Sequence, residues 1–401
     1  MRISTSQTYD AAIDTLMRRQ RDMSDAQVQL TSGKRLNRAS DDPAAAGRAE
    51  RALAATARAD ASQRGVQASE VLMTQTEGAL ADAGSLLQRA REAMVAAGNG
   101  SYGDAERKTL SAEMRSIREQ LLVVANRSDG GHGFMFGGQG SAQAPFVDAP
   151  GGVQFRGTAG QARAADGEGL PLTLDGNDAW LSARTGNGVF ETRVNASTGS
   201  AWVDAGTVTN PSALTGSTYT IQFGNIAGAV RYSVLKDGAP TAQTNVAFNP
   251  SSSGSVIEVD GMASAFKGTP ANGDSFELRP STSTLSVFDA LDKAVADLAT
   301  PGLSATARAQ HTVQNLNNVD TVLSRLVDAR AQVGNTLNQV SNTGERLAAQ
   351  KLQAQSERAN AEDLDMVSAI SAFQSKQSGY DAALKSYSMV QRLSLFNYVN
   401  V

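Results

Sequence analysis

The chain has 401 residues, a formal net charge of -4 and no cysteine, and its length predicts two or three domains rather than one core. The acidic balance excludes nucleic acid as the main partner, because phosphate binding requires a surplus of basic residues. The missing cysteine excludes disulfides and thiolate catalysis. The sequence has no run of about 20 apolar residues, which is the length that a membrane-spanning helix requires.

The first predicted element is an amphipathic helix over residues 8–31. Residues at steps of three and four share one stripe of a helix. This stripe consists of Ile13, Leu16, Gln20, Met23, Gln27 and Leu30. A stripe this narrow is typical of a coiled-coil seam, which requires a partner helix, and the glutamines in it lower stability but can fix register.

The break after this helix carries residues that end one helix and start the next. Gly33 can end a helix in the left-handed conformation. Asp42 can cap the next helix, with Pro43 at the first helical position. Asp41 and Asp42 are the one carboxylate pair that suggests catalysis, but no histidine lies near them, and capping is the favoured interpretation.

Two further helices are predicted, over residues 43–97 and from Asp104 to about residue 128. The first is rich in strong helix formers, and a straight helix of that length would be about 80 Å long. Its apolar stripe consists of Met73, Thr76, Leu80, Ala83, Leu87, Ala90, Met94 and Ala97. Asp104 is the predicted N-cap of the second helix.

Between residues 141 and 284, short apolar runs alternate with turn residues. This pattern predicts antiparallel strands, for example over 219–223, 230–235 and 275–278. Asp237 and Gly238 suggest a hairpin turn. We expect one compact β-rich domain. Four aromatic residues are assigned to its core, with a glycan-binding platform as the alternative; they are Trp180, Trp202, Tyr219 and Tyr232.

Helical periodicity returns at about residue 285 and continues to the C-terminus. One long helix carries the stripe Leu316, Val319, Leu323, Leu326, Val333, Leu337, Val340 and Leu347. A break near residues 361–364 precedes the last helix. Its stripe consists of Met366, Ile370, Phe373, Gln377, Tyr380, Leu384 and Tyr387, and Leu393, Leu395 and Phe396 follow.

The stripes at the two chain ends can meet only if the chain doubles back. We therefore predict an α+β multidomain fold, in which both chain ends form a long antiparallel helical coiled-coil stalk and a β-rich domain is inserted between them. The predicted segments are an N-terminal arm (1–42) that pairs with a C-terminal arm (362–401), two halves of a helical rod (43–140 and 285–361) and the β-rich insert (141–284).

Several motifs resemble those of the flagellin superfamily. Residues 30–44, Leu-Thr-Ser-Gly-Lys-Arg-Leu-Asn-Arg-Ala-Ser-Asp-Asp-Pro-Ala, are similar to the signature in which a Leu-Ser-Ser-Gly element leads to an Asp-Asp helix start; they include Gly33, Arg38, Asp41, Asp42 and Pro43. Residues 1–5, 134–138 and 389–398 resemble the hook–filament junction proteins of this superfamily. The resemblance covers residues 1–146 and 287–401.

This resemblance implies a structural protein of the bacterial flagellum, with no enzymatic activity and no cofactor. The implied partners are hook-associated protein 1, flagellin, further copies of the chain in a ring, and an export chaperone at the C-terminal region. Family members are secreted by type III export, which fits an N-terminus without a Sec-type signal peptide. The implied location is the hook–filament junction, and the arms are expected to order on assembly.

Three alternatives stay open. The first is flagellin itself, which residues 1–5 and 394–396 disfavour. The second is a surface adhesin with a glycan-binding β domain on a helical stalk. An enzyme is the least favoured, because the sequence shows neither a metal motif nor a set of nucleophile, base and orienting residue.

Overall fold

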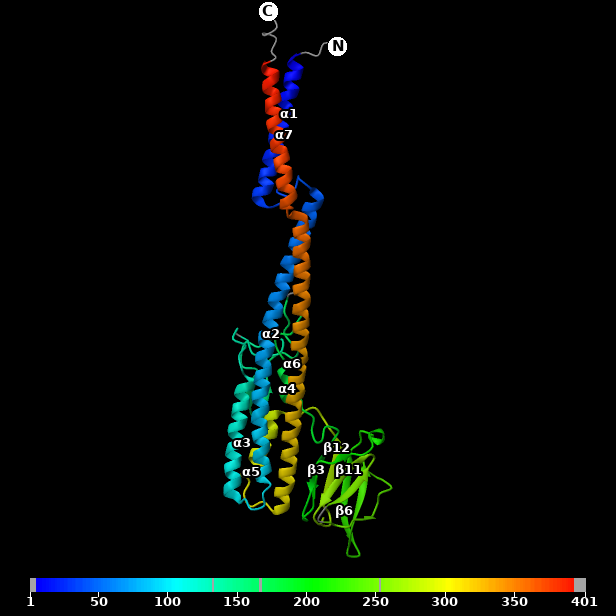
Figure 1. The fold of residues 1–401 in the computed structure, drawn as a ribbon. Coiled ribbons are helices and arrows are strands. Elements are labelled where there is room, and N and C mark those ends of the chain that lie inside the picture. The colour runs from blue at the N-terminus through cyan, green and yellow to red at the C-terminus, as the bar shows by residue number, and fades with distance from the viewer. Residues whose placement is uncertain (1–4, 132, 166–167, 252–253, 393–401) are drawn as a thin grey trace, which may run out of the picture. The chain divides into compact units, whose positions relative to one another are not determined.

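A computed structural model describes residues 5–131, 133–165, 168–251 and 254–392 (Figure 1). The α-helices are α1 (Thr5–Ser32), α2 (Pro43–Ala97), α3 (Asp104–Ala125), α4 (Gly176–Leu181), α5 (Val287–Ala299), α6 (Ala305–Glu362) and α7 (Met366–Arg392). The strands are β1 (Phe146–Ala149), β2 (Gly152–Phe155), β3 (Phe190–Ala196), β4 (Trp202–Val203), β5 (Thr207–Val208), β6 (Tyr219–Ile226), β7 (Ala229–Lys236), β8 (Ala239–Pro240), β9 (Val246–Ala247), β10 (Ser255–Val259), β11 (Met262–Lys267) and β12 (Ser275–Pro280). Long helices from both chain ends and an antiparallel β domain between them confirm the predicted fold class.

The chain forms two compact units, residues 1–64 with 343–401 and residues 65–342. In the first unit, small side chains fill most of the buried positions of α2 and α6. These residues are Ala45, Ala49, Ala52 and Ala59 on α2, and Ala354 and Ala361 on α6, beside the larger Leu347. An ion pair of 2.7 Å between Lys351 Nζ and Asp60 Oδ1 joins the two helices. The alanine content of the sequence therefore serves helix packing here.

In the second unit, parts of α2 and α6 share one core with α3 and α5. Members of this core include Leu80, Leu87, Met114, Ile117, Leu121, Leu291, Val319 and Leu326. The α3 helix begins at Asp104 itself, so the prediction that Asp104 is the N-cap is wrong. Gly103 takes that position, and Asp104 Oδ2 instead accepts a hydrogen bond of 3.1 Å from the Gly302 amide.

The β1–β2 hairpin and α4 belong to this helical core, although the sequence places them in the β-rich segment. Trp180 of α4 is fully buried and stacks on Phe288 of α5, with ring centroids 6.0 Å apart. It also meets Phe136 edge-on at 5.3 Å. The physical reason is that these large aromatic rings bury their apolar area against one another, which ties the hairpin and α4 to α5.

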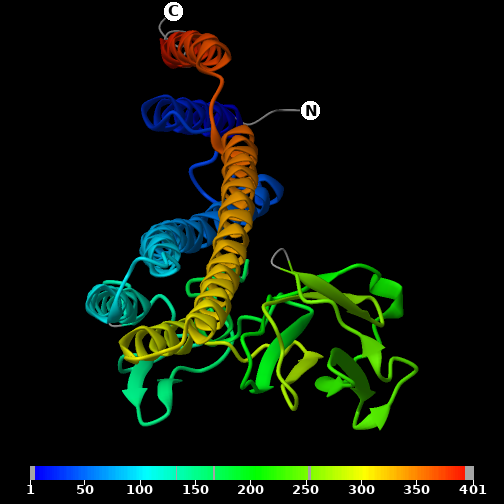
Figure 2. The same ribbon diagram turned by 90° about the horizontal axis from the view of Figure 1, so that it is seen from below.

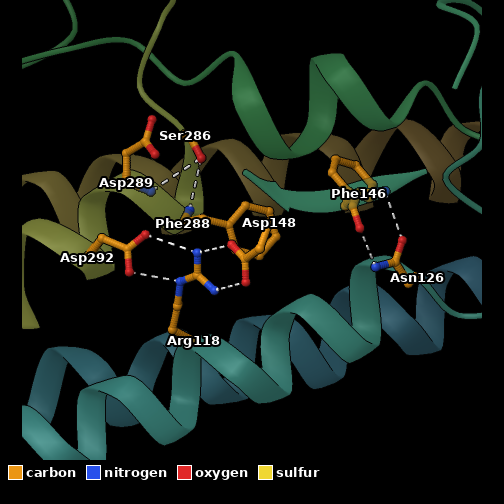
Figure 3. Close-up of polar contacts among 8 residues, drawn as sticks. All are labelled: Arg118, Asn126, Phe146, Asp148, Ser286, Phe288, Asp289 and Asp292. Atoms are coloured by element: carbon orange, nitrogen blue, oxygen red, sulfur yellow. Dashed lines mark hydrogen bonds and ion pairs between the residues drawn. The ribbon is translucent and has the colours of Figure 1, made fainter. Parts of the chain in front are cut away.

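Polar contacts fix the hairpin against the helices (Figure 3). Arg118 of α3 lies between Asp148 of β1 and Asp292 of α5, at 2.7 Å from Asp148 Oδ2 and 2.8 Å from Asp292 Oδ1. The hydrogen bond to Asp148 is the main reason that the pKa of Arg118 is raised, and Arg118 in turn lowers the pKa of Asp148. Asn126 adds two hydrogen bonds to the backbone of Phe146, of 2.8 and 2.9 Å.

The remaining strands form two sheets around a second core. One sheet has the order β3-β12-β6-β7-β8, with β9 also on β7, and the other has the order β10-β11-β4, with β5 also on β11. Their shared core includes Phe190, Val203, Tyr219, Ile221, Phe223, Phe266, Phe276 and Leu278. Asp237 and Gly238 have φ of 48° and 83° between paired Lys236 and Ala239, which confirms the predicted hairpin turn.

Two connections hold this sandwich to the helices of its unit. The chain enters and leaves through a paired segment, in which the Ala183 and Leu285 amides each donate to the other's carbonyl, at 3.0 and 2.9 Å. The buried side chain of Gln310 on α6 bonds both the N–H and the C=O of Val203 in β4, at 2.8 and 3.2 Å. Within this unit the sandwich lies on one side of α6, and α3 lies on the other (Figures 1 and 2).

Candidate assembly interface

The terminal helices α1 and α7 lie side by side in the first unit (Figure 1). Tyr9 and Tyr387 meet edge-on with ring centroids 5.5 Å apart, and the hydrogen bond with Tyr9 is the main reason that the pKa of Tyr387 is raised. Lys376 Nζ donates to the carbonyl of Asp22 at 3.3 Å. The guanidinium of Arg19 lies against Gly379, at a position that a side chain there would share.

The predicted stripe residues divide into three groups. Half-buried are Ile13, Leu16, Met23, Leu30, Phe373, Tyr380 and Tyr387. Exposed are Gln20, Gln27, Gln377, Met366, Ile370 and Leu384. Leu393, Leu395 and Phe396 lie outside the described residues. The pairing of α1 with α7 therefore brings together only part of the predicted seam, and its role in assembly stays a prediction.

Four exposed apolar residues of the arms are missing from the predicted stripes. They are Met17 at 52%, Val28 at 50%, Val367 at 78% and Met389 at 64% exposure. Three of them directly follow a stripe residue in the sequence, so a search for a wider stripe would have found them. Together with Met366 and Ile370, they give the arm helices several exposed apolar side chains, which are candidates for contacts with other chains.

A joint connects the N-terminal loop after α1 to the turn between α6 and α7. Gly33 ends α1 with φ of 67°, as the sequence predicts. Its carbonyl accepts from the Leu364 amide at 3.1 Å, and the Arg35 amide donates to the Glu362 carbonyl at 2.7 Å. Lys34 Nζ lies 2.9 Å from Glu362 Oε2. Both breaks in the helical pattern are therefore hydrogen-bonded to each other.

The signature residues 37–43 organise the start of α2. The carboxylate of Asp41 accepts from the backbone amides of Asn37 and Arg38, at 3.1 and 2.8 Å. Asp42 accepts from the Ala45 amide at 2.9 Å, the main interaction that lowers the pKa of Asp42, and Pro43 is the first helical residue. The two carboxylates thus bond to backbone amides, as helix caps do.

The ion pair at the joint predicts a pH effect. The pKa of Glu362 lies below its ordinary 4.5, chiefly because Lys34 donates to it. Its stabilisation is therefore fully present above the unfolded pKa and is lost as the pH falls through the lowered one. We expect Glu362→Gln to lower the melting temperature at pH 7, by no more than about 1 kcal/mol of stability because Lys34 is exposed, and to have no effect at acid pH.

Thermal denaturation of both chains across the acid range measures this difference. Asp363→Asn is the matched control, because the carboxylate next in sequence is exposed and the ion pairs described at the joint are made by Glu362 instead. A difference between wild type and Glu362→Gln that persists unchanged in acid would contradict the assignment.

The second unit contains a cavity of about 600 Å³ between β3, α5 and α6, lined by residues that include Glu191, Lys293 and His311. Glu191 forms an ion pair of 3.0 Å with Arg279. Within the described ranges, no group of three His, Asp or Glu residues could hold a metal ion. No described helix is both long and apolar enough to cross a membrane. Neither finding supports the alternative that the chain is an enzyme.

Comparison with known proteins gives a consistent set of similarities. The family model for the bacterial flagellin N-terminal helical region matches residues 3–141. Flagellar hook-associated protein 3 of Salmonella typhimurium is 34% identical over 156 residues, which are 38% of this chain and 48% of that protein. The chain thus aligns with about half the length of this relative.

Two other similarities extend further along the chain. Flagellar hook-associated protein 3 of Escherichia coli is 23% identical over 404 residues, covering 99% of both chains. The crystal structure of the flagellar junction protein from Legionella pneumophila has a TM-score of 0.64 at 28% identity, covering 70% of this chain and 94% of that one. The chain therefore resembles the flagellins over its N-terminal helical region and flagellar hook-associated protein 3 over nearly its whole length.

Proposed function

We propose that this chain is a structural subunit of the bacterial flagellum, which joins the hook to the flagellin filament. The observation that carries the proposal is the alignment with hook-associated protein 3 of Escherichia coli over 99% of both chains. Hook-associated protein 1 would bind on the hook side, flagellin on the filament side, and further copies of this chain would complete a ring. Export would follow the type III route, with a chaperone at the C-terminal region.

The apolar surface of the arms supports this function. A pair of helices that exposes Met17, Val367 and Ile370 gains burial only from neighbouring chains. Each fully buried side chain of this kind contributes about 1.5–3 kcal/mol. Subunits of a ring or helical assembly pack through non-identical faces, so each arm pair would contact neighbours on more than one side. The five predicted segments, from arm to arm, are proposed as the functional divisions of the chain.

A strain that lacks the gene tests the proposal. We expect intact hooks without filaments, flagellin released into the medium, and filaments restored when the wild-type gene is returned. Electron microscopy counts hooks and filaments, and immunoblotting of the medium measures flagellin. Filaments of normal number on the deletion strain would refute the function. The flagellin alternative predicts a different result, because purified flagellin polymerises alone into long filaments and a junction protein does not.

The arms are proposed to order on assembly, with the entropy cost offset by burial between subunits. In a dilute monomer, we expect the backbone amides of residues 5–32 and 366–392 to exchange with deuterium much faster than those of α3 and α5. The buried α3 and α5 helices are the internal control, since Ile117 and Leu291 are fully buried. Equal protection of the arms and of these helices would contradict ordering on assembly. Hydrogen–deuterium exchange with mass spectrometry makes the comparison.

The glycan-binding alternative has little support in the sandwich. Tyr219 is buried in its core, and Trp180 is buried in the helical core instead. Trp202 and Tyr232 are only half-buried, but Trp202 packs under the Lys267 ammonium at 5.1 Å and Tyr232 packs on Phe223. The aromatic rings thus lie among other side chains rather than on one open platform.

A further inference from the structure

The methionines of the chain fall into two groups by exposure. The sequence has ten methionines and no cysteine. Those between residues 65 and 342 are all buried, with exposures of 1% for Met73 and Met94, 0% for Met114, 4% for Met135 and 5% for Met262. On the arm helices, Met17, Met366 and Met389 are 52%, 44% and 64% exposed, and Met23 is half-buried. The exposed thioethers of the described residues therefore all lie on α1 and α7.

Thioether sulfur reacts with two-electron oxidants such as hydrogen peroxide. The O–O bond of the peroxide breaks and an S–O bond forms, so that the sulfur is oxidised to a sulfoxide and the peroxide is reduced to water. The reaction turns a flexible apolar side chain into a polar one. Access to the sulfur decides which residue reacts, and no thiol in this chain competes for the oxidant.

We propose that Met17, Met366 and Met389 are an oxidation site, at which sulfoxide formation by peroxide-class oxidants prevents the arms from assembling. The inference rests on the proposed function, because it assumes that this surface is buried between subunits. A sulfoxide in an apolar interface loses its hydrogen bonds to water without gaining others. The sensitivity is confined to the time before assembly, since burial removes the sulfur atoms from the solvent.

Peptide mapping tests the site independently of assembly. The purified full-length monomer is treated with hydrogen peroxide, and mass spectrometry follows sulfoxide at each methionine. We expect the three arm methionines to reach half conversion roughly tenfold sooner than the buried five, in line with their access to solvent. In guanidinium, where the fold is lost, all should react at similar rates. Equal rates in the native monomer would overturn the proposed site.

Binding to filaments tests the consequence. Sheared flagellin filaments are sedimented with wild-type chain before and after peroxide treatment. We expect treatment to reduce the bound fraction by about tenfold, which corresponds to about 1.4 kcal/mol. The triple variant Met17→Leu, Met366→Leu, Met389→Leu lacks the oxidisable sulfur, so its bound fraction should not change on treatment, whatever its starting value. Oxidised wild type that binds as well as untreated wild type would overturn the proposal.

A second set of variants separates the polarity of the arms from general oxidative damage. Glutamine imitates the polarity of the sulfoxide at similar length, and it favours helix. The triple Met→Gln variant is expected to lose filaments in the deletion strain, whereas Val256→Gln, at a 66% exposed position on β10, should not. Normal filaments with the triple Met→Gln variant would overturn the proposal. Untreated wild type that fails to bind filaments would instead count against the proposed function, and the mapping result would still decide the site.

Discussion

Removal of residues 365–401 is expected to abolish filament attachment and to leave the second unit folded. The truncation deletes α7, which lies beside α1 and carries most of the exposed large apolar side chains described on the arms. Without it, Ile13, Leu16 and Met23 of α1 lose the helix against which they are half-buried. Because none of the deleted residues belongs to residues 65–342, the cores of that unit keep all their contacts.

Swimming in soft agar and electron microscopy measure the loss in a deletion strain that expresses the truncated chain. Circular dichroism of the purified protein shows whether the second unit still melts cooperatively. Ile226→Ser, at a 48% exposed position at the end of β6, is the control for a change outside the arms and should swim normally. Normal motility of the truncated strain would contradict the assembly role of the C-terminal arm.

Trp180→Ala is expected to destabilise the second unit by about 3–5 kcal/mol, the usual cost of removing a large aromatic side chain from a core. Trp180 is fully buried and contacts the rings of Phe136 and Phe288. The substitution would leave a cavity where the hairpin, α4 and α5 meet, and the hairpin would lose its main apolar anchor. Motility should fall with the fraction of folded chain rather than through loss of a binding surface.

Urea denaturation followed by circular dichroism measures this effect. The chain has two tryptophans, and Trp202 supplies the matched control, because it is half-buried on the short strand β4. Trp202→Ala should cost clearly less than Trp180→Ala. Equal costs for the two substitutions would show that Trp180 does not anchor the helical core.

The long helices were the most predictable part of the fold. In α2, however, the sequence pattern revealed only the C-terminal half of the buried seam. In α2 the buried residues follow a strict seven-residue repeat, which consists of Ala45, Ala52, Ala59, Val66, Met73, Leu80, Leu87 and Met94. From Met73 onward, the apolar side chains make this seam visible in the sequence. Before Met73, alanine occupies both buried and exposed positions, so hydrophobic periodicity carries no signal there.

The joint and the partition of the β-rich segment could not be predicted. The joint depends on backbone hydrogen bonds between Arg35 and Glu362 and between Gly33 and Leu364, and such pairing leaves no mark on the side-chain pattern. The assignment of Trp180 to the core of the β-rich domain is wrong, because its neighbours Phe136 and Phe288 lie far from it in the sequence, and only the fold brings them together in the helical core. Local patterns predicted the elements, and long-range contacts decided which elements share a core.

The sandwich is an inserted domain whose first and last segments pair with each other. Ala183 and Leu285 bond to each other across the point of insertion, and Thr185 continues the pairing to Thr282 at 2.9 Å. This pairing therefore brings the two ends of the inserted segment together beside the helical bundle, whatever the length or fold of the segment between them. Domain insertions are tolerated where the ends lie close together, and the closure cost changes only slowly with the length of the intervening loop. The sandwich can thus be lost, enlarged or exchanged in evolution while α5 and α6 keep their places.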